Sequence, residues 1–325
     1  MKPSPAFQPT FTVPNYHQKL SAVRPVQVYT YDFREAPPGP APGAPGLCGT
    51  VHGLASVAHL PPHDHEHHEV ALVAAGSALH RTAYNARLVG RGSVLTASPS
   101  DTHAFERIDG LVMINCTYLT EYLFYDVREI LSVPGLAPLF FREALFGAGL
   151  DMGLPQWMVS DTEMTACMRE LDDIAAERAR DDPSPVFMRR TLEKLLLLLC
   201  RSFRASGEEL RLPRDPVVRK LLERIEEMVV NGEPFDARAL AAGAGVSRDR
   251  LARRFRHAVG RNPNDYYQHR RVQQACCLLL DRGRTPTGVA HELGYYDAAH
   301  FSRLFKRYRG ITPRDFRARY VDEAR

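Results

Sequence analysis

The sequence predicts an α+β protein with two domains, an amino-terminal β-barrel with flanking helices and a carboxy-terminal domain made only of helices. Short apolar segments bounded by turn residues, typical of antiparallel strands, continue up to about Leu119. After that point apolar residues recur at the spacing of amphipathic helices. The charge changes too: from Asp215 onward there are 22 Lys and Arg against 14 Asp and Glu, whereas the preceding part holds 20 against 24. Basic charge gathered at one end is typical of a domain that meets a polyanion.

The composition is that of a globular protein of 325 residues, with 44% hydrophobic and 25% charged residues. We expect no secretory signal, because "MKPSPAFQPT" lacks an apolar core behind a basic start. The longest apolar run is also far too short for a membrane span. The six cysteines show no paired spacing, so a cytoplasmic location is predicted. The expected boundaries are a first domain over 1–205, a linker over 206–216 and a second domain over 217–321.

The first domain begins with a Pro/Gly-rich segment, Pro37 to Gly46, that is expected to be a surface loop. Strands are expected in the segments "EVALVAAG", "SALHRTAYNARLVGRG", "SVLTASPSDTHAF" and "GLVMINCTYL". Everything from there to the linker has helical spacing.

The last predicted helix of this domain has Ser184 as its cap and Pro185 in its first turn. It carries a broad apolar stripe made of Met188, Leu192, Leu195, Leu196 and Leu199. Two uses of this stripe are possible. The helix can pack on the β region as part of the core, or part of the stripe can meet a second subunit in a homodimer.

The segment "LAAGAGVSRDRLARRFRHAVG", Leu240 to Gly260, has the pattern of a helix-turn-helix. Gly245 permits the tight turn, and Ser247 caps the second helix. The spacing of that helix predicts a buried face of Leu251, Phe255 and Val259. The exposed side, which is free to enter a major groove, is predicted to carry Arg248, Asp249, Ala252, Arg253 and Arg256.

The same pattern returns about fifty residues later in "VAHELGYYDAAHFSRLFKRYRG", Val289 to Gly310. Gly294 marks the turn and Asp297 is placed as the cap of a second reading helix. Phe301 and Phe305 form its predicted buried edge. The exposed residues are predicted to be Ala298, Ala299, Ser302, Arg303 and Lys306. Two such units joined by one helix could reach successive major grooves of one duplex.

These residues carry a family resemblance. Pro216 to Tyr320 resembles the DNA-binding domain of the AraC/XylS transcription regulators through "LAAGAGVS", Leu251 to Phe255, and Arg271 with Ala275. The strongest match is "GYYDAAHFSRLFKRYRGITPRDFR", with Tyr295 where phenylalanine is commoner. The resemblance implies a sequence-specific regulator that docks two helix-turn-helix units on double-stranded promoter DNA and usually activates transcription. RNA polymerase is then a further partner.

Within the two reading helices, Arg253 and Arg303 are predicted to read bases because each is centred on its exposed face. Ser247, Arg248 and Lys306 are predicted to contact phosphate. Arg317 and Arg319 follow the second unit and are expected to support the fold or the backbone contact.

The first domain contains "PPHDHEHHEVALVAAG", Pro61 to Gly76. In one strand, period 2 would place His63, His65, His67 and Glu69 on one face and His68 on the other. The stretch matches the first motif of the cupin barrel, H-x-H-x-x-x-E followed by a glycine, and a second motif that departs from the fuller pattern ends at His103. The barrel also resembles, more loosely, the rhamnose-responsive activators of the same family. A cupin-like effector-sensing domain is therefore expected.

Three interpretations of the histidines fit. His63, His65, Glu69 and His103 could hold a divalent metal. The same residues, with His80 and Tyr84, could hydrogen-bond a small polyol such as a sugar. They could also form a solvated rim that binds nothing. The attached DNA-binding domain favours an effector pocket, and the resemblance favours a sugar.

An enzyme is the rival class, because cupin folds also host oxygenases and isomerases. The sequence carries no serine elbow, phosphate-binding glycine loop or zinc-protease helix motif. We therefore predict a regulator and not an enzyme, with a metal-dependent enzyme or a metal sensor fused to a DNA-binding domain as the alternative.

Overall fold

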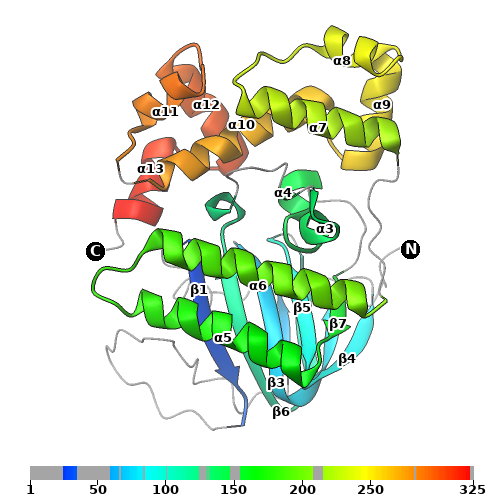
Figure 1. Cartoon of the computed structure of the whole chain (residues 1–325), viewed down its shortest axis with the longest axis vertical. Coiled ribbons are helices and arrows are strands. Elements are labelled where there is room, and N and C mark those ends of the chain that lie inside the picture. The colour runs from blue at the N-terminus through cyan, green and yellow to red at the C-terminus, as the bar shows by residue number, and fades with distance from the viewer. Residues whose placement is uncertain are drawn as a thin grey trace.

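The computed structural model describes residues 25–34, 59–65, 67–82, 85–99, 101–123, 130, 132–146, 154–207, 215–281 and 283–322. The predicted Pro37–Gly46 loop and most of the predicted linker lie outside these residues. We call 25–207 the sheet domain and 215–322 the helical domain, and the two are stacked along the long axis of the molecule (Figure 1). None of the described helices is long and apolar enough to cross a membrane.

The sheet domain has a seven-stranded antiparallel sheet in the order β1-β6-β3-β5-β7, with β2 paired to β6 and β4 to β3. The strands are β1 (Val26–Asp32), β2 (His59–His63), β3 (His68–Thr82), β4 (Ala86–Gly90), β5 (Ser93–Ala97), β6 (His103–Tyr118) and β7 (Gln156–Met158). The strand β7 was not predicted, since it lies in a region whose overall spacing is helical. Its three residues extend the edge of the sheet beyond β5.

The two long paired strands β3 and β6 are irregular near the middle of their pairing. Their register shifts between Val73 and Leu79, and Gly76 adopts a left-handed φ of 66°. A Cβ atom on Gly76 would lie 2.1 Å from the carbonyl oxygen of Gly110, which also has positive φ. Only glycine fits such an approach of two backbones. This irregularity curls the sheet, so that one of its faces becomes the inside of the domain.

The inner face has its own apolar core, formed by Tyr29, Tyr31, Phe33, Leu60, Ala71, Val73, Ala78, Val89, Leu95, Phe105, Leu111 and Met113. The outer face, which includes Val70 and Leu72, packs in a second cluster with the helices of the same domain. Those helices are η1 (Thr120–Tyr122), α3 (Leu136–Phe140), α4 (Arg142–Phe146), α5 (Asp161–Arg178) and α6 (Pro185–Ala205). In Figure 1, α5 and α6 lie across this face of the sheet.

Helix α6 begins as the sequence predicts, with the Ser184 side chain accepting a hydrogen bond from the Phe187 N–H and Pro185 in the first turn. The leucines of its apolar stripe are at most 1% exposed within the single chain: Leu192, Leu195, Leu196 and Leu199. The stripe therefore belongs to the core of its own subunit, as the first of the two interpretations expected.

The helical domain contains α7 (Pro216–Val230), α8 (Ala237–Gly243), α9 (Arg248–Val259), α10 (Pro263–Leu279), α11 (Pro286–Glu292), α12 (Ala298–Arg309), α13 (Pro313–Arg317) and η2 (Ala318–Asp322). Helix α10 connects the two helix-turn-helix units (Figure 1). Its residues Tyr266, Tyr267 and Cys277 belong to the apolar cluster that also contains buried residues of the sheet domain, α7 and α9. Val272, Ala275, Cys276 and Leu279 belong to a separate cluster with α11, α12 and α13.

Candidate effector site and nucleic-acid interface

Three histidines meet at one point inside the curled sheet. His63, His65 and His103 each offer a ring nitrogen, and these atoms lie within 4.8 Å of one another. The two Nε2 atoms of His65 and His103 are 2.8 Å apart, and the His63 and His103 ring centroids are 4.5 Å apart. All three side chains are buried. We call these three residues the histidine cluster.

The pairing of β2 with β6 and the connection after β2 bring these three histidines together. His63 ends β2 and pairs directly with His103 at the start of β6. His65 follows after the strand has ended, and its N–H donates to the carbonyl of Pro99 at 3.4 Å. The prediction of one continuous strand is therefore wrong, because β2 ends at His63 and β3 begins at His68. His65 reaches the cluster through the connection and not through strand alternation.

His67 does not join the cluster, contrary to the prediction. It lies with His68 in a different pocket, toward the helical domain. His68 does face away from Glu69, as expected, but it is buried and stacks on Tyr118 with ring centroids 5.8 Å apart. Burial, followed by the charge of Arg142, lowers the pKa of His68 to about 3. The outer face of β3 is covered by protein at this point. The alternation of side chains along one strand does not predict such a cover.

Glu69 lies behind His65. Its Oε2 atom is 3.9 Å from His65 Nδ1 and accepts a hydrogen bond of 2.9 Å from the Tyr29 hydroxyl. Burial, with the charge of Glu69 adding to it, raises the pKa of Tyr29 well above 10, so that the phenol stays a donor. The carboxylate thus lies beside the ring whose other nitrogen faces His103.

His80 takes the corresponding place behind His103, with its Nε2 atom 3.0 Å from His103 Nδ1. Burial lowers the pKa of His80 to about 4 and keeps this ring neutral at physiological pH. Its other face packs on Phe105, with ring centroids 4.9 Å apart. Tyr84, the remaining predicted effector residue, lies outside the described residues.

This arrangement is suited to a metal ion. Imidazole nitrogens are ligands of Zn²⁺ and other transition metals at about 2.0–2.1 Å. Histidines that bind a metal through one nitrogen commonly bond a carboxylate or another acceptor through the second. Here Nε2 of His65 and of His103 face each other, while the Nδ1 atoms face Glu69 and His80. His63, His65 and His103 would be the ligands, with Glu69 as an orienting group. The predicted role of Glu69 as a fourth ligand has less geometric support.

The first helix-turn-helix consists of α8, a turn at Gly245 and α9. Gly245 has a φ of 65°, and the Ser247 side chain accepts a hydrogen bond from the Arg250 N–H. The residues predicted to be buried are at most 4% exposed: Leu251, Phe255 and Val259. Of the predicted DNA-facing residues, Ala252 is half-buried, and the exposed ones are Ser247, Arg248, Asp249, Arg253 and Arg256.

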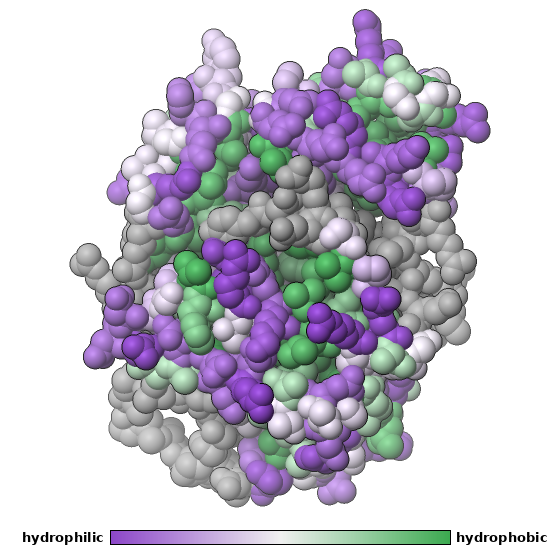
Figure 2. Space-filling model, viewed as in Figure 1, coloured by the Kyte–Doolittle hydropathy of each residue, from purple (hydrophilic) through white to green (hydrophobic). Residues whose placement is uncertain are grey.

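The second helix-turn-helix consists of α11, a turn at Gly294 and α12. Asp297 caps α12 by accepting from the His300 N–H at 2.5 Å. Phe301 and Phe305 are fully buried. Ser302 is half-buried, and the other predicted DNA-facing residues are exposed: Ala298, Ala299, Arg303 and Lys306. The two units therefore present matching surfaces, and the side of the helical domain seen in Figure 2 is mainly hydrophilic.

Other arginines of this domain hold the units in place. Arg254 donates twice at 2.8 Å to Asp215, the residue that caps α7, and so fixes α9 to that helix. Arg271 lies 4.0 Å from the Tyr295 ring centroid and donates to the Leu293 carbonyl, which braces the second turn. Arg317 donates to the carbonyl of Arg284, in agreement with its predicted supporting role.

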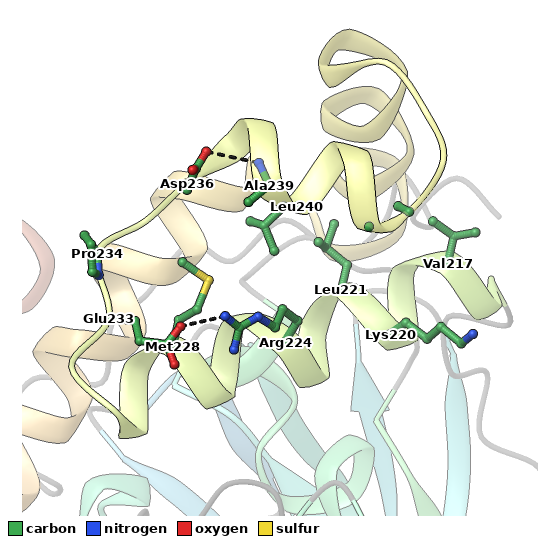
Figure 3. A pocket seen from close by; sticks show the side chains of 12 residues that line it. Val217, Lys220, Leu221, Arg224, Met228, Glu233, Pro234, Asp236, Ala239 and Leu240 are labelled. Carbon is green, nitrogen blue, oxygen red and sulfur yellow. Dashed lines mark hydrogen bonds and ion pairs between the residues drawn. The ribbon is translucent and has the colours of Figure 1, made fainter.

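A groove of about 580 Å³ lies between α7 and α8 (Figure 3). Several of its polar groups have partners within the chain. Arg224 is paired with Glu227 and Glu233, and Asp236 caps α8. The groove is accordingly explained as a packing feature of the first unit.

Comparisons with known proteins agree with this architecture. An AraC-like ligand binding domain matches residues 44–185, and a helix-turn-helix domain matches residues 240–319. The transcriptional activator RhaS of Klebsiella pneumoniae is 27% identical over 267 residues, covering 79% of this chain and 87% of that protein. The activator RhaR of Yersinia pestis is 23% identical over 260 residues, covering 80% and 85%.

Two solved structures are also similar. One is an AraC-type regulator from Chromobacterium violaceum, with 29% identity, a TM-score of 0.30 and coverage of 32% of this chain and 90% of that chain. The other is an apo variant of ToxT from Vibrio cholerae, with 12% identity, a TM-score of 0.39 and coverage of 91% and 98%. Because both TM-scores are low, the assignment depends on the sequence matches. Those matches, together with a sheet domain and two helix-turn-helix units in one chain, identify the protein as a DNA-binding regulator with an AraC-like ligand-binding domain and not an enzyme, similar over most of its length to activators of the AraC family.

Proposed function

We propose that this protein activates transcription when a sugar binds inside the sheet domain at the histidine cluster. The observation that supports the site is the convergence of four buried imidazoles, His63, His65, His80 and His103, in the part of the chain that matches the ligand-binding domain. The resemblance to rhamnose-responsive activators supports the sugar. As an activator, the protein would also contact RNA polymerase.

The effector site is tested by measuring binding of common sugars to the full chain by calorimetry. His80→Ala and Glu69→Gln are expected to weaken sugar binding about 5- to 150-fold, since each leaves buried polar groups without a partner at about 1–3 kcal/mol. His291→Ala, which removes an exposed histidine in the other domain, is the matched control and should bind normally. Unchanged sugar binding in both test variants would place the effector elsewhere.

A divalent metal at the same place is the second candidate, favoured by the three convergent nitrogens of the histidine cluster. Elemental analysis of purified protein is expected to find one metal per chain if this candidate holds. That metal should be lost on His103→Ala and kept in the His291→Ala control. Metal-free protein that still binds its sugar would contradict the metal candidate, and only the polyol interpretation would remain.

DNA reading is tested with Arg253→Ala and Arg303→Ala, both exposed on the reading helices. If each side chain reads a base, its loss should weaken binding to the specific site by about 1–3 kcal/mol and should change binding to random DNA much less. Arg190→Ala on α6 serves as the control, because this side chain lies in the sheet domain and pairs with Glu193. Equal losses on specific and random DNA, measured by titration at several salt concentrations, would identify both residues as phosphate contacts.

We further propose that the protein acts as a homodimer. Since the leucines of α6 are buried in their own chain, a second copy would have to use another surface. Sedimentation velocity of the full chain tests this, and a monomer at all concentrations would contradict it.

A further inference from the structure

A second pocket lies at the seam between the two domains. It has a volume of about 220 Å³ and is lined from the sheet domain by the start of β3, the end of β6, η1 and α4. From the helical domain it is lined by residues of α10 and α12, together with Arg261 just before α10. We call it the seam pocket. It does not include any member of the histidine cluster.

Direct contacts hold the two sides of the seam together. Arg309, in the last turn of α12, lies 2.6 Å from the carboxylate of Glu121 on η1. Gln273 on α10 donates to the carbonyl of Ala144 on α4 at 3.2 Å. Glu121 and Gln273 are buried. The walls of the pocket therefore come from both domains, and their positions are fixed by paired groups.

Three nitrogens of lining residues are buried and have no hydrogen-bond partner among the residues that the structure describes. They are His269 Nδ1, Arg261 Nε and Arg309 Nε. Buried donors are nearly always satisfied in folded proteins, so each exception calls for a water, an ion or a ligand. Here all three belong to residues that line one small polar pocket, from which we infer a shared partner.

The partner must accept hydrogen bonds. Burial, followed by the charges of Arg261, Arg270 and Arg309, lowers the pKa of His269 well below 6.5, so that its ring is neutral and its Nδ1 atom donates or accepts according to the tautomer, whereas the two arginine Nε atoms can only donate. The other charged groups at the pocket are Glu121, which is paired with Arg309, and Glu143. Asp265 partly neutralises Arg261 at 3.4 Å. The unpaired hydrogen-bonding groups whose role is fixed by their chemistry are therefore donors, the Nε groups of two guanidiniums.

We propose that the seam pocket binds a small oxyanion, a carboxylate or phosphate group, that contacts both domains at once. Its volume suits inorganic phosphate or a short dicarboxylate and is below the usual range of drug-sized pockets. Charge-assisted bonds from arginine to such groups are the strong ones in proteins. The ligand stabilises the docked arrangement of the sheet domain and the helical domain. A ligand that binds only the docked arrangement shifts the equilibrium toward it by linkage.

The test is calorimetric titration of the full chain with inorganic phosphate and, separately, with malonate. At least one of the two should bind saturably with a stoichiometry of one. Arg261→Gln and His269→Phe should each weaken that binding about tenfold or more, and the phenylalanine keeps a ring against Tyr308, whose centroid lies 5.7 Å from that of His269. Arg190→Gln removes an exposed arginine that pairs with Glu193 and does not line the seam pocket, and this variant should bind as the wild type does.

Thermal unfolding of each variant without ligand shows whether it is folded, so that a loss of binding can be separated from a loss of structure. Saturation by phosphate but not malonate identifies a phosphate site, and the reverse identifies a carboxylate site. An equal, weak response in all variants, including Arg190→Gln, would mean an adventitious ion only and would overturn the proposal. So would the absence of saturable binding by either probe.

Discussion

Gly76→Ala is expected to destabilise the sheet domain by about 3 kcal/mol or more. A left-handed φ costs a non-glycine residue roughly 1–2 kcal/mol, and Gly76 has a φ of 66°. The added Cβ would also lie 2.1 Å from the Gly110 carbonyl oxygen, which belongs to backbone and cannot rotate away. Overpacking of this kind adds about 1–3 kcal/mol. The loss can be measured by urea unfolding, followed by circular dichroism.

Gly232→Ala is the matched control. Gly232 has nearly the same φ, 67°, but a Cβ there would meet nothing within 4 Å. Its substitution should therefore cost only the backbone component, about 1–2 kcal/mol. If the two variants lose the same stability, the close approach of β3 to β6 does not constrain the fold.

Glu226→Ala is expected to lower the stability of the helical domain by about 3–5 kcal/mol, the usual cost of breaking a buried ion pair from one side. Glu226 accepts from Arg270 at 2.9 and 3.2 Å and from the Tyr266 hydroxyl at 2.8 Å. Glu226 and Arg270 are at most 2% exposed. Removing the carboxylate leaves the guanidinium buried without its counter-charge.

The neighbouring residue supplies the control. Glu227 pairs with Arg224 at 3.1 Å, but both side chains are about half exposed, so Glu227→Ala should leave the unfolding midpoint almost unchanged. Replacing the buried pair together, by Glu226→Leu with Arg270→Met, should recover much of the loss. A Glu226→Ala variant as stable as Glu227→Ala would show that water or another group compensates Arg270.

The helical domain was predictable in detail because its signals are local. A cap such as Ser247 or Asp297, a turn glycine and apolar residues four apart act within one or two helical turns, so their meaning does not depend on distant parts of the chain. The structure places each of these residues as the spacing predicts.

The histidine cluster was predictable only in part. His63, His65 and His103 do meet, yet the reason is the pairing of β2 with β6 and not alternation along one strand. The motif identified the residues, but it contains no information on where the strand breaks. His67 was placed wrongly for that reason.

The seam could not be predicted at all. Its contacts join residues more than 100 positions apart, as between Gln273 and Ala144. Glu121 and Arg309 are single charged residues in segments that would read equally well as solvated surface. Only the way in which the domains dock decides that they meet.

Helix α10 contributes side chains to two separate apolar clusters, one under each helix-turn-helix unit. Because one rigid helix belongs to both, the reading surfaces on α9 and α12 keep a constant separation and rotation. Duplex DNA turns once in about 10–10.5 base pairs, so each inserted base pair rotates a downstream half-site by roughly 34–36° around the axis. If both units read DNA as proposed, the two half-sites of an operator for this protein must keep one helical phase relative to each other. Mutations can change their bases one at a time, but insertions and deletions between them cannot accumulate in small steps.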